Sequence, residues 1–128
     1  MKNKKLVGNA VIITLTWVMI TASCTHQDGM IPNVSFSRDI MPIMQASCSI
    51  NSSCHIGATN ANGHIDLSDS AAYNTLIQKG LINTRTPTAS LLYSEINTGF
   101  MPKAPYAHLT GNEMKIVLDW IRQGAKNN

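Results

Sequence analysis

The chain has few aromatic and few charged side chains, which make up 5% and 13% of its 128 residues. It lacks alternating apolar and polar strand patterns, internal repeats, a glycine loop that cradles phosphate, and Lys and Arg clustered on one face. These absences argue against a β-sheet domain, a repeat protein, a nucleotide-binding site and a nucleic-acid partner. The sequence has no paired carboxylates and no Ser/His/Asp set that would suggest an enzyme. We interpret four carboxylates of the C-terminal half as helix caps or solvated side chains: Asp66, Asp69, Glu113 and Asp119.

The N-terminus has the pattern of an export signal. An apolar stretch from about residue 10 to residue 20 follows three lysines: Lys2, Lys4 and Lys5. This pattern predicts a signal peptide over residues 1–23, because the apolar stretch is too short for a good membrane span. The residues Thr21-Ala22-Ser23-Cys24 resemble a bacterial lipobox, which implies lipidation of Cys24 and attachment to a membrane. An uncleaved anchor, or an ordinary signal with Cys24 incidental, remains the alternative.

Removal of the signal changes the charge of the chain. Three of the ten Lys and Arg residues precede Cys24, so seven cationic and seven anionic side chains remain, and the formal net charge becomes zero. The sequence pI of 8.9 therefore overstates the basic character of the exported protein. Residues 24–34 contain Gly29 and Pro32 without periodicity, and we predict a tether there, followed by one small domain over residues 35–128.

The pattern of residues 35–128 predicts about four short helices joined by long loops. The helical segments are residues 39–48, with Asp39 as the cap, and residues 68–80, 86–97 and 110–124. In the last segment Thr110 and Glu113 form a capping box ahead of an apolar stripe. Long loops and few aromatic residues in so small a helical domain suggest that an apolar cofactor completes the core.

A Cys-His motif lies directly after the first predicted helix and reads CSINSSCH from Cys48 to His55. The attachment signal for c-type haem is Cys-x-x-Cys-His, and the spacer here is three residues longer. Three interpretations stay open. The segment can hold haem with a bulged spacer, form a Cys48–Cys54 disulfide in a haem-free exported domain, or bind zinc with His64 or His108 as a further ligand.

Four segments together resemble a known family: SRDIMPIMQASC, GHIDLSDSAAYNTLI, SLLYSEINTGFMP and LTGNEMKIVLDWIRQGA. They are similar to class I cytochrome c, and more narrowly to the cytochrome c-like domains of exported bacterial lipoproteins, including the planctomycete type. The resemblance runs from about Phe36 to Ala125. Its most specific part is Met101-Pro102 in a loop, followed by the capped helix that ends in DWIRQGA.

The resemblance implies a small all-α cytochrome c-like fold around one covalent haem c. Cys48 and Cys54 would form the thioethers, His55 would be the proximal iron ligand and Met101 the distal one. The first and last helices would pack together, Trp120 would lie beside the haem, and a tyrosine would reach a propionate: Tyr93 or Tyr106.

The roles that the resemblance implies predict a function in single-electron transfer and not in catalysis. His and Met ligation raises the reduction potential and leaves no open position on the iron. We therefore expect an exported electron carrier on the periplasmic side of the envelope, anchored through Cys24 and exchanging electrons with partner proteins that the sequence does not identify. The alternative is a haem-free lipoprotein domain for binding or structure, stapled by a Cys48–Cys54 disulfide.

Overall fold

The computed structural model describes residues 29–59 and 62–128. The expected signal peptide, Cys24 and the first part of the tether lie outside the described residues. The described part contains four α-helices and no strand, which confirms the all-α expectation. The elements in chain order are η1 (Phe36–Ile40), α1 (Met41–Ser47), α2 (Ala72–Gln78), η2 (Pro87–Ala89), α3 (Leu91–Asn97) and α4 (Gly111–Arg122). Within these residues no helix has the length and apolar character needed to cross a membrane.

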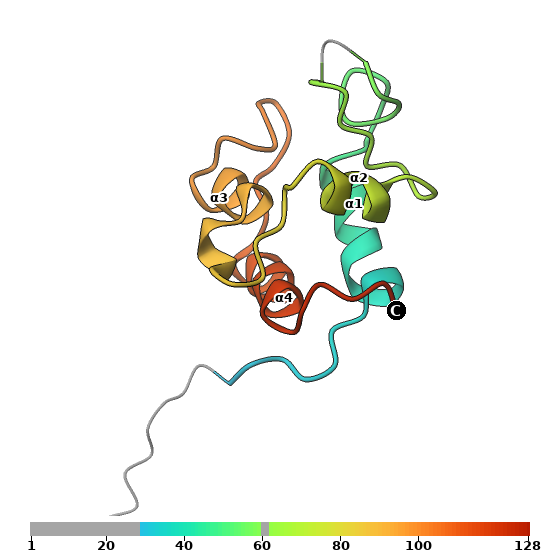
Figure 1. The fold of residues 1–128 in the computed structure, drawn as a ribbon. Helices are drawn as coiled ribbons and strands as arrows, with labels where there is room; N and C mark the ends of the chain where they lie inside the picture. Colours follow the sequence, from blue (N-terminus) through green and yellow to red (C-terminus); the bar gives the residue numbers. More distant parts are fainter. Residues whose placement is uncertain (1–28, 60–61) are drawn as a thin grey trace, which may run out of the picture.

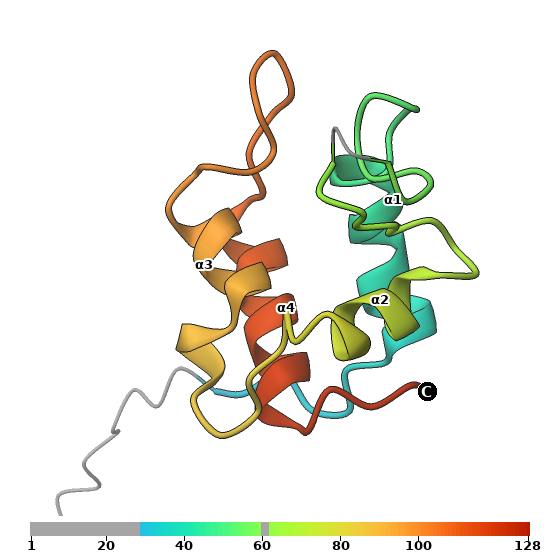
Figure 2. The same cartoon turned by 45° about the horizontal axis from the view of Figure 1, so that its top comes forward.

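The helices form two groups that are joined through the core. The η1 turn continues into α1 beside α2, while α3 and α4 lie together on the other side (Figure 1). Two loop segments, residues 48–59 and 98–110, extend beyond the helices toward the same end of the molecule (Figure 2). Side chains from both groups meet in one apolar core, and the most deeply buried are Ile40, Leu76, Val117, Trp120 and Ile121.

The first helix begins earlier than the sequence predicts, with the π-helical turn η1. Its N-cap is Ser35, whose hydroxyl accepts a hydrogen bond from the Arg38 amide at 3.3 Å. The prediction of Asp39 as the cap is therefore wrong. The Asp39 carboxylate instead accepts from the Ser35 amide at 2.7 Å, which is the reciprocal bond of a capping arrangement.

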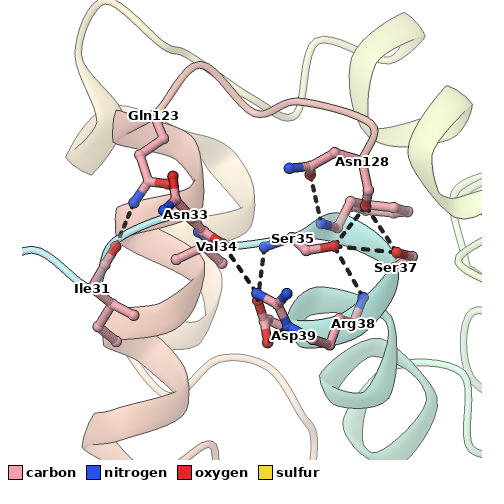
Figure 3. Close-up of polar contacts among 10 residues, drawn as sticks. Ile31, Asn33, Val34, Ser35, Ser37, Arg38, Asp39, Gln123 and Asn128 are labelled. Carbon is pink, nitrogen blue, oxygen red and sulfur yellow. Dashed lines mark hydrogen bonds and ion pairs between the residues drawn. The ribbon is translucent and has the colours of Figure 1, made fainter.

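The C-terminal residue satisfies the remaining donors of this turn (Figure 3). Asn128 accepts from the Phe36 amide through its side chain at 3.0 Å and from the Ser37 amide through its backbone carbonyl at 2.9 Å. The first N–H groups of a helix have no partner within it. Asn128 thus supplies acceptors that η1 needs, and it ties the end of the chain to the start of the domain.

The segment before η1 lies on α4. The Gln123 side chain donates to the carbonyl oxygen of Ile31 at 2.6 Å and accepts from the Val34 amide at 3.0 Å, and Figure 3 shows the bond to Ile31. Val34 is buried, and Ile31 packs against the core. Residues 31–34 of the segment expected to be a tether are therefore part of the packed structure.

The capping box of α4 is present as predicted. The Glu113 amide donates to the Thr110 hydroxyl at 3.2 Å, and the Thr110 amide donates to the Glu113 carboxylate at 2.7 Å. The interpretation of Asp119 as a cap or solvated side chain is wrong, because this residue is fully buried. Its carboxylate accepts hydrogen bonds from Lys115 at 2.6 Å, from Arg122 at 3.1 Å and from the Ile31 amide at 2.9 Å.

Aromatic contacts join the two ends of the domain. The Phe36 ring lies 5.2 Å from the Tyr73 ring and 5.4 Å from the Trp120 ring, between centroids. The contact between the first and last helical segments therefore involves η1 and α4. Such aromatic pairs add specific geometry to the apolar burial.

Candidate functional site

A cavity of about 500 Å³ is lined by the four residues that the sequence predicts for the site: Cys48, Cys54, His55 and Met101. Its volume lies within the range of roughly 300–1,000 Å³ that is typical of small-molecule and cofactor sites. The rest of the lining is mainly aliphatic, with contributions from the segment before α2, from α2, from the segment after it and from α3: Ile65, Leu67, Leu76, Leu81, Leu92 and Ile96. A planar apolar group would therefore find aliphatic contacts in this cavity, with thiol, imidazole and thioether groups in the lining.

The five-residue spacer folds back on itself. The Cys48 amide still donates to the Met44 carbonyl at 2.8 Å, so Cys48 continues α1. The Cys54 amide donates to the Asn51 carbonyl at 3.0 Å, which makes a tight turn. The His55 amide then donates to the Cys48 carbonyl, also at 3.0 Å. These bonds return Cys54 and His55 to the end of α1, and the additional spacer residues project as a bulge.

The His55 ring has a defined hydrogen-bond partner. Its Nδ1 lies 3.3 Å from the carbonyl oxygen of Ile65, and the His55 carbonyl accepts from the Leu67 amide at 2.8 Å. With the proton on Nδ1, the imidazole donates to that carbonyl, and Nε2 keeps a free lone pair. Histidines that bind metals commonly make such a bond through their second nitrogen, because it fixes the tautomer and the ring orientation.

Asn62 holds the turn that follows His55. Its side-chain amide donates to the carbonyl oxygens of Cys54 at 3.1 Å and Gly57 at 2.6 Å, and its side-chain oxygen accepts from the Thr59 amide at 3.0 Å. Asn62 is buried and also lines the cavity. It therefore fixes the backbone on which Cys54 and His55 sit.

Both cysteines are free and partly buried in this structure. Burial, with a smaller contribution from nearby Cys54, raises the pKa of the Cys48 thiol to about 11. A thiol with this pKa is protonated at neutral pH. Cys48 is therefore mostly in the thiol form. The thiolate is the form that reacts as a nucleophile or binds a metal.

Met101 reaches the cavity from the second loop, residues 98–110. Its amide donates to the Glu95 carbonyl of α3 at 3.1 Å, and Pro102 beside it is buried. Gly99 has a φ of +71°, and an added Cβ there would lie 3.5 Å from the His108 ring. The loop thus combines a backbone bond to α3 with a left-handed turn that favours glycine.

Other residues considered in the sequence analysis lie elsewhere. Both His64 and His108 are exposed, and the lining of this cavity includes neither. Across residues 29–59 and 62–128, no group of three or more His, Cys, Asp or Glu side chains is arranged to hold a metal ion. Trp120 is in the core but does not belong to the lining, whereas Tyr106 does.

Sequence reasoning missed two residues of the site. It identified residues 57–67 as a loop from their Gly and Asn content, but it assigned no role to Asn62. It also missed Asn51, whose side-chain amide donates to the Tyr106 hydroxyl at 2.6 Å across the two loops. The only local signal was the frequency of asparagine in turns, where its side chain bonds nearby backbone groups.

No family model matches this chain, and neither a curated protein nor a solved structure shows significant similarity to it.

Proposed function

We propose that the protein is an exported single-electron carrier that holds one covalent c-type haem with His55 and Met101 as axial ligands. In this proposal the domain has a cytochrome c-like fold, and a lipid on Cys24 anchors it to a membrane on the periplasmic side. Its partners are redox proteins of the envelope, and it catalyses no reaction of its own.

One observation carries the proposal: two thiols, an imidazole and a thioether line the same apolar cavity. A disulfide staple needs neither His55 nor Met101, and a zinc site needs no aliphatic cavity. The hydrogen bond from His55 to Cys48 closes the spacer, so a Cys-x5-Cys-His segment can present both thiols and the imidazole together. This set of groups fits the attachment and ligation of haem.

Each residue has a definite task in this proposal. Cys48 and Cys54 would hold the haem covalently, each by addition of its thiol S–H across one vinyl group. His55 would bind the iron through Nε2 while its Nδ1 stays hydrogen-bonded to the Ile65 carbonyl. Haem would supply a one-electron Fe(III)/Fe(II) couple, and the Met101 thioether would favour its reduced form. The aliphatic side chains of the cavity would exclude water from the iron and reduce its reorganisation.

A pyridine haemochrome spectrum tests the proposal. The full chain is produced in cells that have haem-attachment machinery, and the spectrum is recorded before and after extraction with acidified acetone. Haem that stays with the polypeptide supports the proposal, and the band position reports one thioether or two. Protein without haem contradicts it and favours the haem-free domain, for which non-reducing mass analysis would detect a Cys48–Cys54 disulfide.

A further inference from the structure

The spacer between the cysteines contacts the loop that carries Met101. Asn51 lies in the middle of the spacer, and its side-chain amide donates to the Tyr106 hydroxyl at 2.6 Å. Two further groups of Asn51 are bonded to residues close by in the chain. Its side-chain oxygen accepts from the Ser53 amide at 2.8 Å, and its carbonyl accepts from the Cys54 amide at 3.0 Å. Asn51 is therefore a fixed donor on the bulge.

Tyr106 is likewise held in place on the opposite loop. Its amide donates to the Lys103 carbonyl at 3.1 Å, and its side chain is part of the cavity lining together with Met101 and Pro102. At the other end of this stretch the Met101 amide is bonded to α3. Residues 101–106 thus have one attachment to α3 and a second one to the spacer.

We infer that the Asn51–Tyr106 bond is a latch that holds the loop of Met101 against the loop of His55. The inference rests on the proposed function, and it assigns a role to the length of the spacer. A two-residue spacer would only span the distance between the two thioethers. The longer spacer here forms a bulge that reaches the loop of Met101. Asn51 and Tyr106 are positioning residues for Met101, because they act on the iron only through its loop.

The latch limits access of external ligands to the iron. A small neutral ligand such as imidazole competes with Met101 and binds only when the loop has opened. A single solvent-accessible hydrogen bond contributes modestly, so its removal raises the open population by about fivefold. The observed affinity for the competing ligand rises by the same factor, because it is proportional to the population that can bind.

Titration of the ferric haem protein with imidazole tests the latch. We expect Tyr106→Phe and Asn51→Ala each to bind imidazole about fivefold more tightly than the parent, and the double variant to show no further gain. The control is Tyr73→Phe, which removes a tyrosine hydroxyl that donates to the Ala125 carbonyl at 3.1 Å, away from the cavity lining, and leaves the latch intact. Hydrogen exchange at the Met101 and Tyr106 amides should be faster in both single variants and unchanged in the control.

The outcomes separate this inference from the function on which it rests. A haem protein with Met101 ligation whose imidazole affinity and amide exchange are unchanged by Tyr106→Phe overturns the latch and leaves the proposed function standing. Additive effects of the two substitutions also overturn it, because a single bond can be lost only once. Parent protein that carries no haem overturns both.

Discussion

The amide of His55 donates a hydrogen bond to the carbonyl oxygen of Cys48, with an N···O distance of 3.0 Å. This bond closes the loop formed by residues 49–53 and brings the end of the Cys-His motif back to α1. The spacer length is thereby taken up by a bulge and does not displace His55 from the cavity. The same bulge carries Asn51 toward Tyr106, so the unusual spacing has a structural use.

Substitution of the cysteines should show which of them forms a proposed thioether. We expect Cys48→Ser and Cys54→Ser each to keep haem on the chain through the remaining cysteine, with a shifted haemochrome band, and the double variant to lose all covalent haem. Mass spectrometry of the extracted polypeptide measures the attachment. Ser52→Ala, at an exposed spacer position, is the control. Covalent haem in the double variant would contradict the assignment of both thiols.

Removal of Met101, the proposed distal ligand, should lower the reduction potential. We expect Met101→Ala to retain covalent haem. Its reduction potential should fall by a substantial fraction of the roughly 0.8 V range over which axial ligands set the potential of haem. Spectroelectrochemical titration measures the change. Met30→Ala is the matched control, because Met30 is exposed and lies before η1. An unchanged potential in Met101→Ala would remove this residue from the ligand set.

Asn62 should matter both for stability and for haem attachment. Asn62→Ala removes three hydrogen bonds around the Cys54–Thr59 turn. Buried groups left without partners are costly, so we expect a loss of about 2 kcal/mol in the free energy of unfolding. Urea titration checks this value, with the exposed Asn74→Ala as the control. We also expect a lower haem content per chain, and equal haem content in the two variants would contradict the positioning role.

Asp119 should make the stability depend on pH in acid. Burial is the largest single influence and opposes ionisation, but hydrogen bonds from Lys115, the Ile31 amide and Arg122 together outweigh it and lower the pKa below the ordinary 3.8. A carboxyl with a lowered folded-state pKa stabilises the fold fully above the ordinary pKa, and this contribution disappears as the pH falls through the folded-state value.

The test of Asp119 compares two variants. Asp119→Asn should lower the free energy of unfolding by roughly 1–3 kcal/mol at neutral pH, because charge-assisted hydrogen bonds are lost. Its deficit relative to the parent should shrink as the pH falls below 3.8. Asp69→Asn, at an exposed position, is the control. Chemical denaturation between pH 2 and 7 measures both, and a pH-independent deficit would contradict the assignment.

Local patterns in the sequence predict the helices well where the relevant contacts are close along the chain. The capping box of Thr110 and Glu113 joins residues three positions apart, and the apolar stripe behind it predicts the buried face of α4. Such local patterns do not predict where the first helix begins. Ser35 and Asp39 satisfy the first donors together with Asn128, and no periodic pattern indicates a partner so distant in the chain.

The sequence by itself determined the all-α character, the loops that carry the Cys-His and Met-Pro segments, and the residue types of the candidate site. These follow from helical periodicity, capping and turn composition, which act over a few residues. Only the tertiary structure decided that Asp119 is buried and that Asn51 meets Tyr106. It also decided that the two segments line one cavity. Such contacts join residues far apart in the chain, and packing of the whole core selects them.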